Sequence, residues 1–271
     1  MGVVGRLDQY GSMLTSEFDE ITANNPSVTG LGTYYSSEFS ENIVDIVRNG
    51  LVLNLDAANL SSYPGSGTTW TDVSGGGNNG TLTNGPTYSS ANGGSIVFDG
   101  SNDYVTLGTP SALNGVQVPI TICMWAKANA FSTYNTLWGV YSSISGGQLY
   151  SLLRVDSGTL RYFASNSAGG IQVNGTLTPS VNVWNFYAVT VSGSISSPSV
   201  TIYLNNSSQT FSYSAFSSSP DLTVDFRIGG NQGGVSEVWN GNISNAMWYN
   251  RALSAAEISQ NYNALRGRFG I

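Results

Sequence analysis

Hydrophobic and polar residues alternate in short runs from residue 50 onward, a pattern typical of β-strands with one buried face. In the run 200–205, for example, Val200, Ile202 and Leu204 fall on one face and the polar residues between them on the other. Tight turns that need a positive φ are indicated by Asn-Gly pairs at 79–80, 84–85, 114–115, 174–175 and 240–241. The pattern predicts an all-β fold with strands at 51–57, 95–100, 103–107, 120–128, 136–141, 148–155, 159–165, 170–177, 183–192, 199–205, 209–214, 223–229 and 237–250.

One helix is specified near the C-terminus. Ser254 is suited to be its N-cap and Glu257, three residues later, completes a capping box. Arg266 and Arg268 near its end suit the negative end of the helix dipole. A single apolar stripe, which we expect to pack on the sheets, is formed by Ile258, Tyr262 and Leu265.

The first 48 residues differ from the rest of the chain. They hold seven acidic residues against two arginines, a local charge of −5. One short helix is predicted in this segment at 37–47. The sequence therefore predicts an N-terminal arm at 1–48 and one large β domain at 49–271. Another short helix, nearer the N-terminus, is indicated by the three- and four-residue spacing of Leu7, Tyr10, Leu14 and Phe18. Two interpretations of these four residues stay open, namely packing on the β domain and docking onto another protein.

Composition excludes several classes of function. Only 9% of the residues are charged, and the net charge of −7 disfavours nucleic acid as a partner. The chain has no histidine, so Ser-His-Asp and Cys-His sites and imidazole metal ligands are excluded. Its one cysteine, Cys123, lies in an apolar strand and is expected to be a buried thiol. The chain contains no run of 18 apolar residues, the length that would predict membrane insertion. No signal peptide is evident, so we expect synthesis in the cytoplasm.

Four stretches of the chain resemble the laminin-G-like branch of the concanavalin-A-like jelly rolls. They are TWTDVSGGGNNGTL (69–82), GSIVFDGSNDYVTL (94–107), VTIYLNN (200–206) and MWYNRALSAAEI (247–258). The resemblance covers about residues 50 to 265. It implies a jelly-roll β-sandwich, here with a short, partly helical N-terminal arm and a C-terminal helix.

The resemblance raises the question of glycoside hydrolysis, because related jelly rolls include glucanases. Their signature, two glutamates flanking an aspartate on one strand, is missing. The β domain has only two glutamates, of which Glu257 belongs to a helix cap and Glu237 has no acid two residues away. A cross-strand pair such as Asp225 with Glu237 is the remaining alternative. We therefore predict no catalytic residues and no enzymatic activity.

Laminin-G-like domains often carry calcium, so the resemblance also implies a candidate metal site. Its residues would be Asp99, Asn102 and Asp103, whose oxygens suit calcium. The alternative is ordinary turn chemistry, in which these side chains bond nearby backbone amides, and it is favoured. Asp56 and Asp72 match family positions that flank the first strand and the WTD segment, and a structural role in anchoring loops explains them as well. No cofactor is predicted, with calcium as the open alternative.

Aromatic residues suggest a carbohydrate site, because flat rings stack on sugars. Trp138 and Tyr141, beside the predicted loop 142–148, are the candidate surface aromatics. Trp125, Trp184 and Trp248 match interior positions of the family and are expected to lie in the core.

The arm and the segment after it (GRLDQYGSML, EFDE, TGLGTYYSSEF, then GLVLNLDAANL) resemble structural proteins of tailed bacteriophages of marine and cyanobacterial hosts. The resemblance implies a non-enzymatic virion protein, a capsid decoration or head-fibre protein mounted through residues 1–48, with other virion proteins as partners. Such proteins are often homotrimers. The alternative is a tail-fibre or receptor-binding, lectin-like protein that adheres to host surface glycans.

Overall fold

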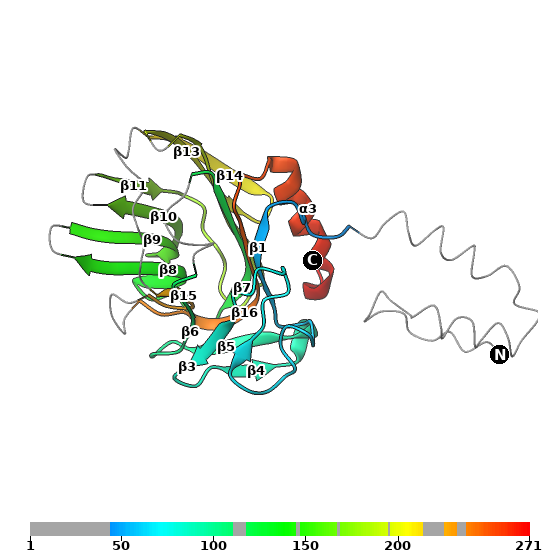
Figure 1. Ribbon diagram of the computed structural model, residues 1–271. Helices are drawn as coiled ribbons and strands as arrows, with labels where there is room; N and C mark the ends of the chain where they lie inside the picture. Colours follow the sequence, from blue (N-terminus) through cyan, green and yellow to red (C-terminus); the bar gives the residue numbers. More distant parts are fainter. Residues whose placement is uncertain are drawn as a thin grey trace, which may run out of the picture. The chain divides into compact units, whose positions relative to one another are not determined.

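Two antiparallel β-sheets stack face to face in the computed structural model (Figure 1). The structure describes residues 44–110, 118–144, 147–166, 169–194, 196–213, 225–231 and 237–271. The arm residues Leu7, Tyr10, Leu14 and Phe18 and both predicted arm helices lie outside the described residues, apart from the last four residues of 37–47.

The described strands form sheet A and sheet B, and every registered pair is antiparallel. Sheet A contains, in spatial order, β14 (Ser207–Ser212), β13 (Ser197–Leu204), β12 (Asn185–Ser194), β7 (Ile120–Ala128), β16 (Asn240–Tyr249), β5 (Ser95–Asp99) and β4 (Thr87–Ser89), with β1 (Leu51–Asp56) paired to β16. Sheet B contains β11 (Gly169–Asn174), β10 (Thr159–Asn166), β9 (Gly147–Asp156), β8 (Tyr134–Ile144), β15 (Phe226–Ile228), β6 (Tyr104–Gly108), β3 (Gly80–Thr83) and β2 (Thr69–Trp70). The predicted all-β sandwich is confirmed.

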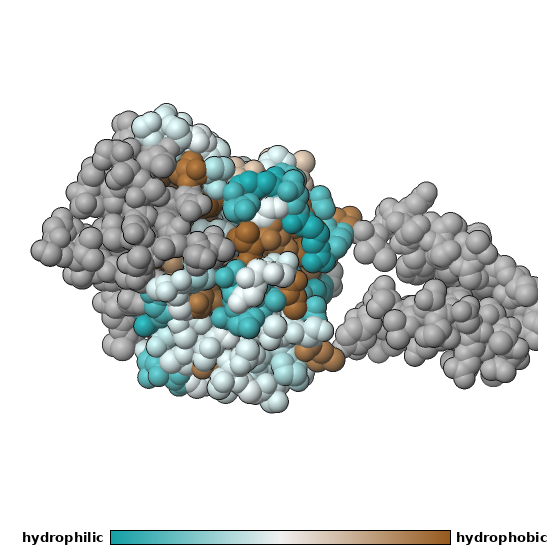
Figure 2. Space-filling model, viewed as in Figure 1, coloured by the Kyte–Doolittle hydropathy of each residue, from teal (hydrophilic) through white to brown (hydrophobic). Residues whose placement is uncertain are grey.

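Strand positions agree with the alternation except where strands are short or where a turn is tight. The short, polar strands β2, β3 and β4 carry too few alternating positions to be predicted. The loop predicted at 142–148 is mostly strand, because β8 continues to Ile144 and β9 begins at Gly147. On the face drawn in Figure 2, the coloured residues are mostly polar or near neutral, and apolar residues form small separate groups. This agrees with a surface made of hydroxyl and amide groups rather than of charges.

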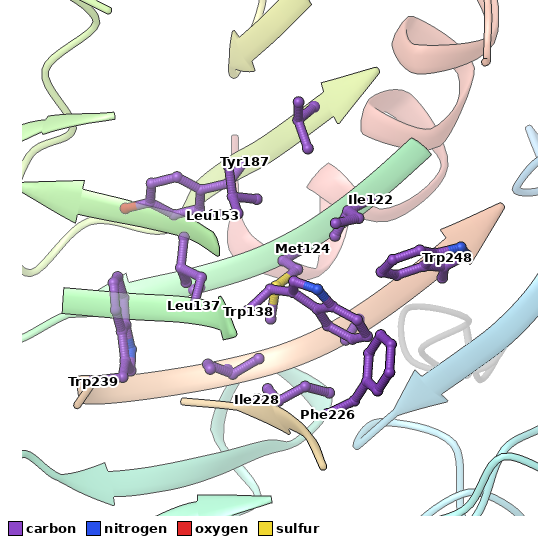
Figure 3. Packing of buried hydrophobic residues seen from close by; sticks show 14 of the residues in the cluster. Ile122, Met124, Leu137, Trp138, Leu153, Tyr187, Phe226, Ile228, Trp239 and Trp248 are labelled. Atoms are coloured by element: carbon purple, nitrogen blue, oxygen red, sulfur yellow. The ribbon is translucent and has the colours of Figure 1, made fainter. Parts of the chain in front are cut away.

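The main core lies between the sheets and is centred on aromatic side chains (Figure 3). Trp138 of sheet B packs against Trp248 of sheet A, with 4.7 Å between ring centroids. Phe226 meets both tryptophans edge to face, at 5.7 and 6.1 Å. Such pairs add about 0.5–1.5 kcal/mol each to the stabilisation that comes from burying apolar area. They hold the middle strands of the two sheets against each other.

The outer face of sheet A is covered by the C-terminal helix α3 (Ala255–Arg266) and the short helix η3 (Gly267–Phe269). Trp125 of β7 stacks on Tyr262 of α3 at 5.4 Å and lies 4.5 Å from Phe269. The predicted capping box of Ser254 and Glu257 is present. A second buried cluster thus lies between sheet A and the helix.

Residues 46–49 are attached to this side of the sandwich. Ile46 and Val47 are buried in the second cluster. The Val47 amide donates to Asn261 Oδ1 (2.8 Å), and the hydroxyl of Tyr249 donates to the Val47 carbonyl (2.9 Å). By contacts, the compact unit that contains the β domain begins at Ile46 and runs to Ile271. Residues 46–48, predicted as the end of the arm, therefore pack with the β domain.

Two aspartates, Asp72 in the TWTDVSGGGNN motif and Asp56 at the end of β1, hold neighbouring segments in place. Asp72 Oδ1 accepts from the amides of Asn54 and Ser74 (both 2.9 Å), and its Oδ2 accepts from the amide of Asn78 (3.0 Å). Asp56 forms a bidentate pair with Arg268 at 2.7 and 2.8 Å. The helix dipole is thus an incomplete account of Arg268, whose partner lies 212 residues away. These contacts are those of the structural role, which is one of the two explanations that the sequence leaves open.

We expect Asp72→Asn to lower the free energy of unfolding by about 1–3 kcal/mol, because the amide nitrogen cannot accept the bonds that a carboxylate oxygen accepts. Urea denaturation of both proteins measures the difference. Asp99→Asn is the matched control, since Asp99 is exposed and accepts only from the amide of Ser101 among the described contacts. Equal losses in the two variants would contradict the anchoring role of Asp72.

Stability should also depend on pH through Glu257. Arg251, and then the amide of Ser254, lower the pKa of this carboxyl from 4.5 to about 2. Because the folded-state pKa is depressed, its stabilisation is complete above about pH 4.5 and is lost as the pH falls towards 2. The native protein should therefore exceed Glu257→Gln in unfolding free energy at pH 6, and the gap should close by pH 2, as equilibrium denaturation at each pH would measure. A gap that is independent of pH would refute this.

Candidate ligand-binding surface

Sheet B presents charged side chains on its outer face, because strands β9 and β10 alternate between inward and outward positions. In β9, Leu153 and Val155 point into the core, and Arg154 between them points outward. In β10, Leu160 and Tyr162 point inward, so Arg161 lies on the outer face. The register pairs Arg154 directly with Arg161 on β10. Two guanidinium groups therefore lie side by side on one surface.

These arginines belong to a chain of ion pairs that crosses the sheet. Arg161 Nη1 lies 3.7 Å from Asp156 Oδ2, and Arg154 Nη2 lies 3.3 Å from the same oxygen. Arg154 Nη1 also contacts Glu237 Oε2 at 3.3 Å. Glu237 accepts a hydrogen bond from the side-chain amide of Asn231. The chain thus runs from β10 over β9 to the segment before β16.

The same chain continues to β15 and β6. Arg227 Nη1 donates to the carbonyl of Asn231 (3.2 Å), and its Nε donates to Asp225 (2.8 Å). Asp225 accepts in turn from the hydroxyl of Thr106 and from the amide of Gly108. We call the side chains that carry these contacts the sheet B network: Arg154, Asp156, Arg161, Asp225, Arg227, Asn231 and Glu237.

Aromatic rings flank the network. The guanidinium carbon of Arg154 lies 4.4 Å from the ring centroids of both Tyr134 and Phe163. That of Arg227 lies 3.9 Å from the ring centroid of Tyr104. A cation over a ring is worth about 0.5–2 kcal/mol, so the rings fix the directions of the arginines. Tyr134 is 36% exposed and offers ring surface to a ligand.

The network combines accessible groups with buried ones. Arg161 has 27% and Glu237 23% of the side chain exposed, whereas Arg154 has only 12%. Two buried polar atoms of this face, Arg154 Nε and Thr136 Oγ1, have no hydrogen-bond partner among the described residues. Such atoms are uncommon in folded proteins. A surface with fixed donors, fixed acceptors and an exposed ring has the chemistry needed to bind a hydroxylated ligand.

The structure explains the acidic turn at Asp99, Asn102 and Asp103. Asp99 Oδ1 accepts from the amide of Ser101 (2.7 Å), and Asp103 Oδ2 accepts from the amide of Asp99 (3.0 Å). The carbonyl of Asn102 accepts from Asn84 (2.9 Å). Burial raises the pKa of Asp103. These bonds from side chains to backbone amides are the ones that the turn interpretation predicts. The described residues contain no group of three or more acidic or cysteine side chains placed to hold a metal ion.

The structure places Trp138, one of the two aromatic residues predicted for a sugar site, in the core, and it leaves the side chain of the other, Tyr141, undescribed. The expectation that Trp138 is a surface residue is wrong, because it is 1% exposed and packs between the sheets. A β-bulge between Thr136 and Trp138 directs both Leu137 and Trp138 into the core. Tyr141 pairs with Tyr150 in the β8–β9 hairpin, but its side chain lies outside the described ones.

The three tryptophans expected in the core are all buried. Only Trp248 lies between the sheets, however, whereas Trp125 and Trp184 belong to the cluster beneath α3. The arginines of the sheet B network were not among the residues predicted from the sequence. Their signal was present, since Arg154, Arg161 and Arg227 interrupt strands at the outward positions of a chain with few charges.

A family model for the concanavalin A-like lectin/glucanases superfamily matches residues 99–259. The chain belongs to this superfamily. A comparison with curated protein sequences gives no significant match. Among the described residues, no helix is long and apolar enough to cross a membrane.

Solved structures share the superfamily's sandwich at low sequence identity. Domain 4 of AbnA, a GH43 extracellular arabinanase from Geobacillus stearothermophilus in complex with arabinotriose, has a TM-score of 0.58 at 16% identity, covering 78% of this chain and 98% of that one. The binding domain of Paraclostridial Mosquitocidal Protein 1 has a TM-score of 0.61 at 16% identity, over 80% and 52% of the two chains. Trypanosoma rangeli sialidase in complex with sialic acid has a TM-score of 0.56 at 16% identity, over 80% and 33%. This chain spans about half of the toxin chain and a third of the sialidase chain.

Proposed function

We propose that this chain is a non-enzymatic binding protein of a bacteriophage virion, anchored through its N-terminal arm, whose sandwich recognises carbohydrate with the outer face of sheet B. The observation that carries the proposal is the position of two features on opposite sides of the sandwich (Figure 1). Residues 46–49 join the domain beside α3, on the outer side of sheet A. The sheet B network lies on the other side. An anchor at the first side would leave the second accessible.

Carbohydrate is the favoured ligand class on chemical grounds. Sugars offer hydroxyl groups, which both donate and accept hydrogen bonds, and C–H faces, which pack on rings. The sheet B network offers carboxylates, guanidinium groups and Tyr134 together. The superfamily contains lectins, and the AbnA domain of similar fold was solved with arabinotriose bound.

The same network argues against catalysis. Glycoside hydrolysis needs two carboxyl groups flanking the substrate, one of which carries a proton as general acid. Asp225 is bound by Arg227, and Glu237 is bound by Arg154. Both carboxyl groups are thus engaged in ion pairs on the outer face of sheet B. The alternative pair of Asp225 with Glu237 is therefore poorly suited to hydrolysis.

Glycan arrays probed with the full chain test the binding role. We expect binding to be weakened about tenfold or more, or about 1.4 kcal/mol, by Tyr134→Ala and by Arg161→Ala. Arg266→Ala, on helix α3, is the control and should bind like the native protein. Array binding should persist in a chelator, whereas its loss would favour calcium at the turn of Asp99 and Asp103. Absence of any glycan binding would contradict the carbohydrate role.

Co-sedimentation with phage particles that lack this protein tests the anchoring role. We expect the full chain to rebind and a 46–271 truncation, which keeps the contacts of Val47, to fold but not to rebind. A 49–271 truncation loses those contacts and should also denature at a lower temperature. Equal rebinding by 46–271 would show that the sandwich makes the contact, and the anchoring proposal would be wrong.

A further inference from the structure

We propose that the ligand of the sheet B network is an uncharged glycan, and that the internal pairing of its arginines disfavours acidic glycans. This inference rests on the proposed carbohydrate role and specifies its ligand class. It is based on the balance of positive and negative charges in the network. This balance is not evident from the sequence, because the members come from distant parts of the chain.

Positive and negative groups alternate along the network and balance in number. Arg161, Asp156, Arg154 and Glu237 follow one another at 3.7, 3.3 and 3.3 Å. Arg227 pairs with Asp225 at 2.8 Å. Each of the three guanidinium groups thus has at least one carboxylate partner within the network. The surface consequently presents dipoles rather than a net positive charge.

An anionic ligand would have to compete with these carboxylates. Two like charges 4 Å apart repel by about 4 kcal/mol at an effective dielectric constant of 20. An acidic sugar near Arg154 would meet both Asp156 and Glu237, which contact that guanidinium. The net charge of −7 over the whole chain adds to the repulsion at long range. A guanidinium group that is already paired with carboxylates has fewer N–H groups left to donate to an anion.

A neutral polyol meets no such competition and matches both kinds of group. Carboxylate oxygens accept from sugar hydroxyl groups, and guanidinium N–H groups donate to them. Glu237 Oε2 accepts from Arg154 and Asn231, while its Oε1 accepts no hydrogen bond from the described residues. Arg161 directs Nη1 towards Asn174 at the accessible edge of the network. Tyr134 adds a partly exposed ring for the C–H face of a sugar.

The charge balance can be altered by one substitution. Glu237→Gln keeps the size of the side chain and removes one negative charge, so one guanidinium charge is no longer compensated. We expect this variant to gain affinity for acidic glycans by about tenfold, with a dependence on salt that the native protein lacks. Glu257→Gln, which changes the net charge equally on the α3 side of the sandwich, is the matched control and should show no gain.

The experiment compares N-acetyllactosamine and arabinotriose with sialylated and sulfated N-acetyllactosamine, by calorimetry at about 0.05 and 0.5 M NaCl. Thermal denaturation of each variant verifies folding. The proposal requires that the native full chain bind a neutral sugar at least about tenfold more tightly than the acidic ones. Tighter binding of an acidic sugar would overturn the inference and leave the carbohydrate role intact. If the native chain binds none of the four sugars, both this inference and the proposed carbohydrate role are overturned. A folded Glu237→Gln without the gain would refute the role of the carboxylates.

Discussion

Strand β16 is the element on which the rest of the sandwich depends. It pairs with β7 along its whole length, and its other edge is shared between β5 and β1. A bulge between Ile243 and Asn245 marks the point where one partner gives way to the other. Its inward side chain Trp248 packs on Trp138 of sheet B, while its outward neighbour Tyr249 bonds Asn261 of α3. One strand thus connects both sheets and the helix.

This arrangement determines which surface is left for a ligand. The inner faces of both sheets form the main core, and α3, η3 and residues 46–47 cover the outer face of sheet A over β7, β12 and β16. The Asp56–Arg268 pair fastens η3 over the end of β1. The outer face of sheet B is a sheet surface that these elements leave open, and the described structure places three of the chain's nine basic residues there.

Sequence reasoning succeeded where the determining interactions are local. Alternation revealed the strands of the core, and the capping box of Ser254 and Glu257 needs only four consecutive residues. It failed where a single irregularity changes the outcome, as when the bulge before Trp138 reverses the direction expected for that side chain. It also failed for Arg268, because nothing within a turn of the helix points to Asp56.

The candidate site was harder to predict because its members come from distant parts of the chain. Arg154 and Glu237 are 83 residues apart, and only the order of strands in sheet B brings them together. The acidic turn at Asp99 attracted attention because its residues are adjacent in sequence, yet local backbone bonds account for it. Proximity in sequence favours turns, whereas binding surfaces on a sheet collect residues across strands.

The proposed role in recognition would account for a network that stability alone does not require. Holding Arg154 largely out of water, between two rings and two carboxylates, has a desolvation cost that the ion pairs only partly offset. Apolar residues of similar volume at these outward positions would cover the sheet as well, and often stabilise a protein by about 1–4 kcal/mol more than a buried ion pair does. What the apolar replacement lacks is a set of donors and acceptors in fixed directions. Because Tyr134 and Phe163 hold the guanidinium from both sides, Arg154 keeps its direction before any ligand arrives, which reduces the entropy lost on binding.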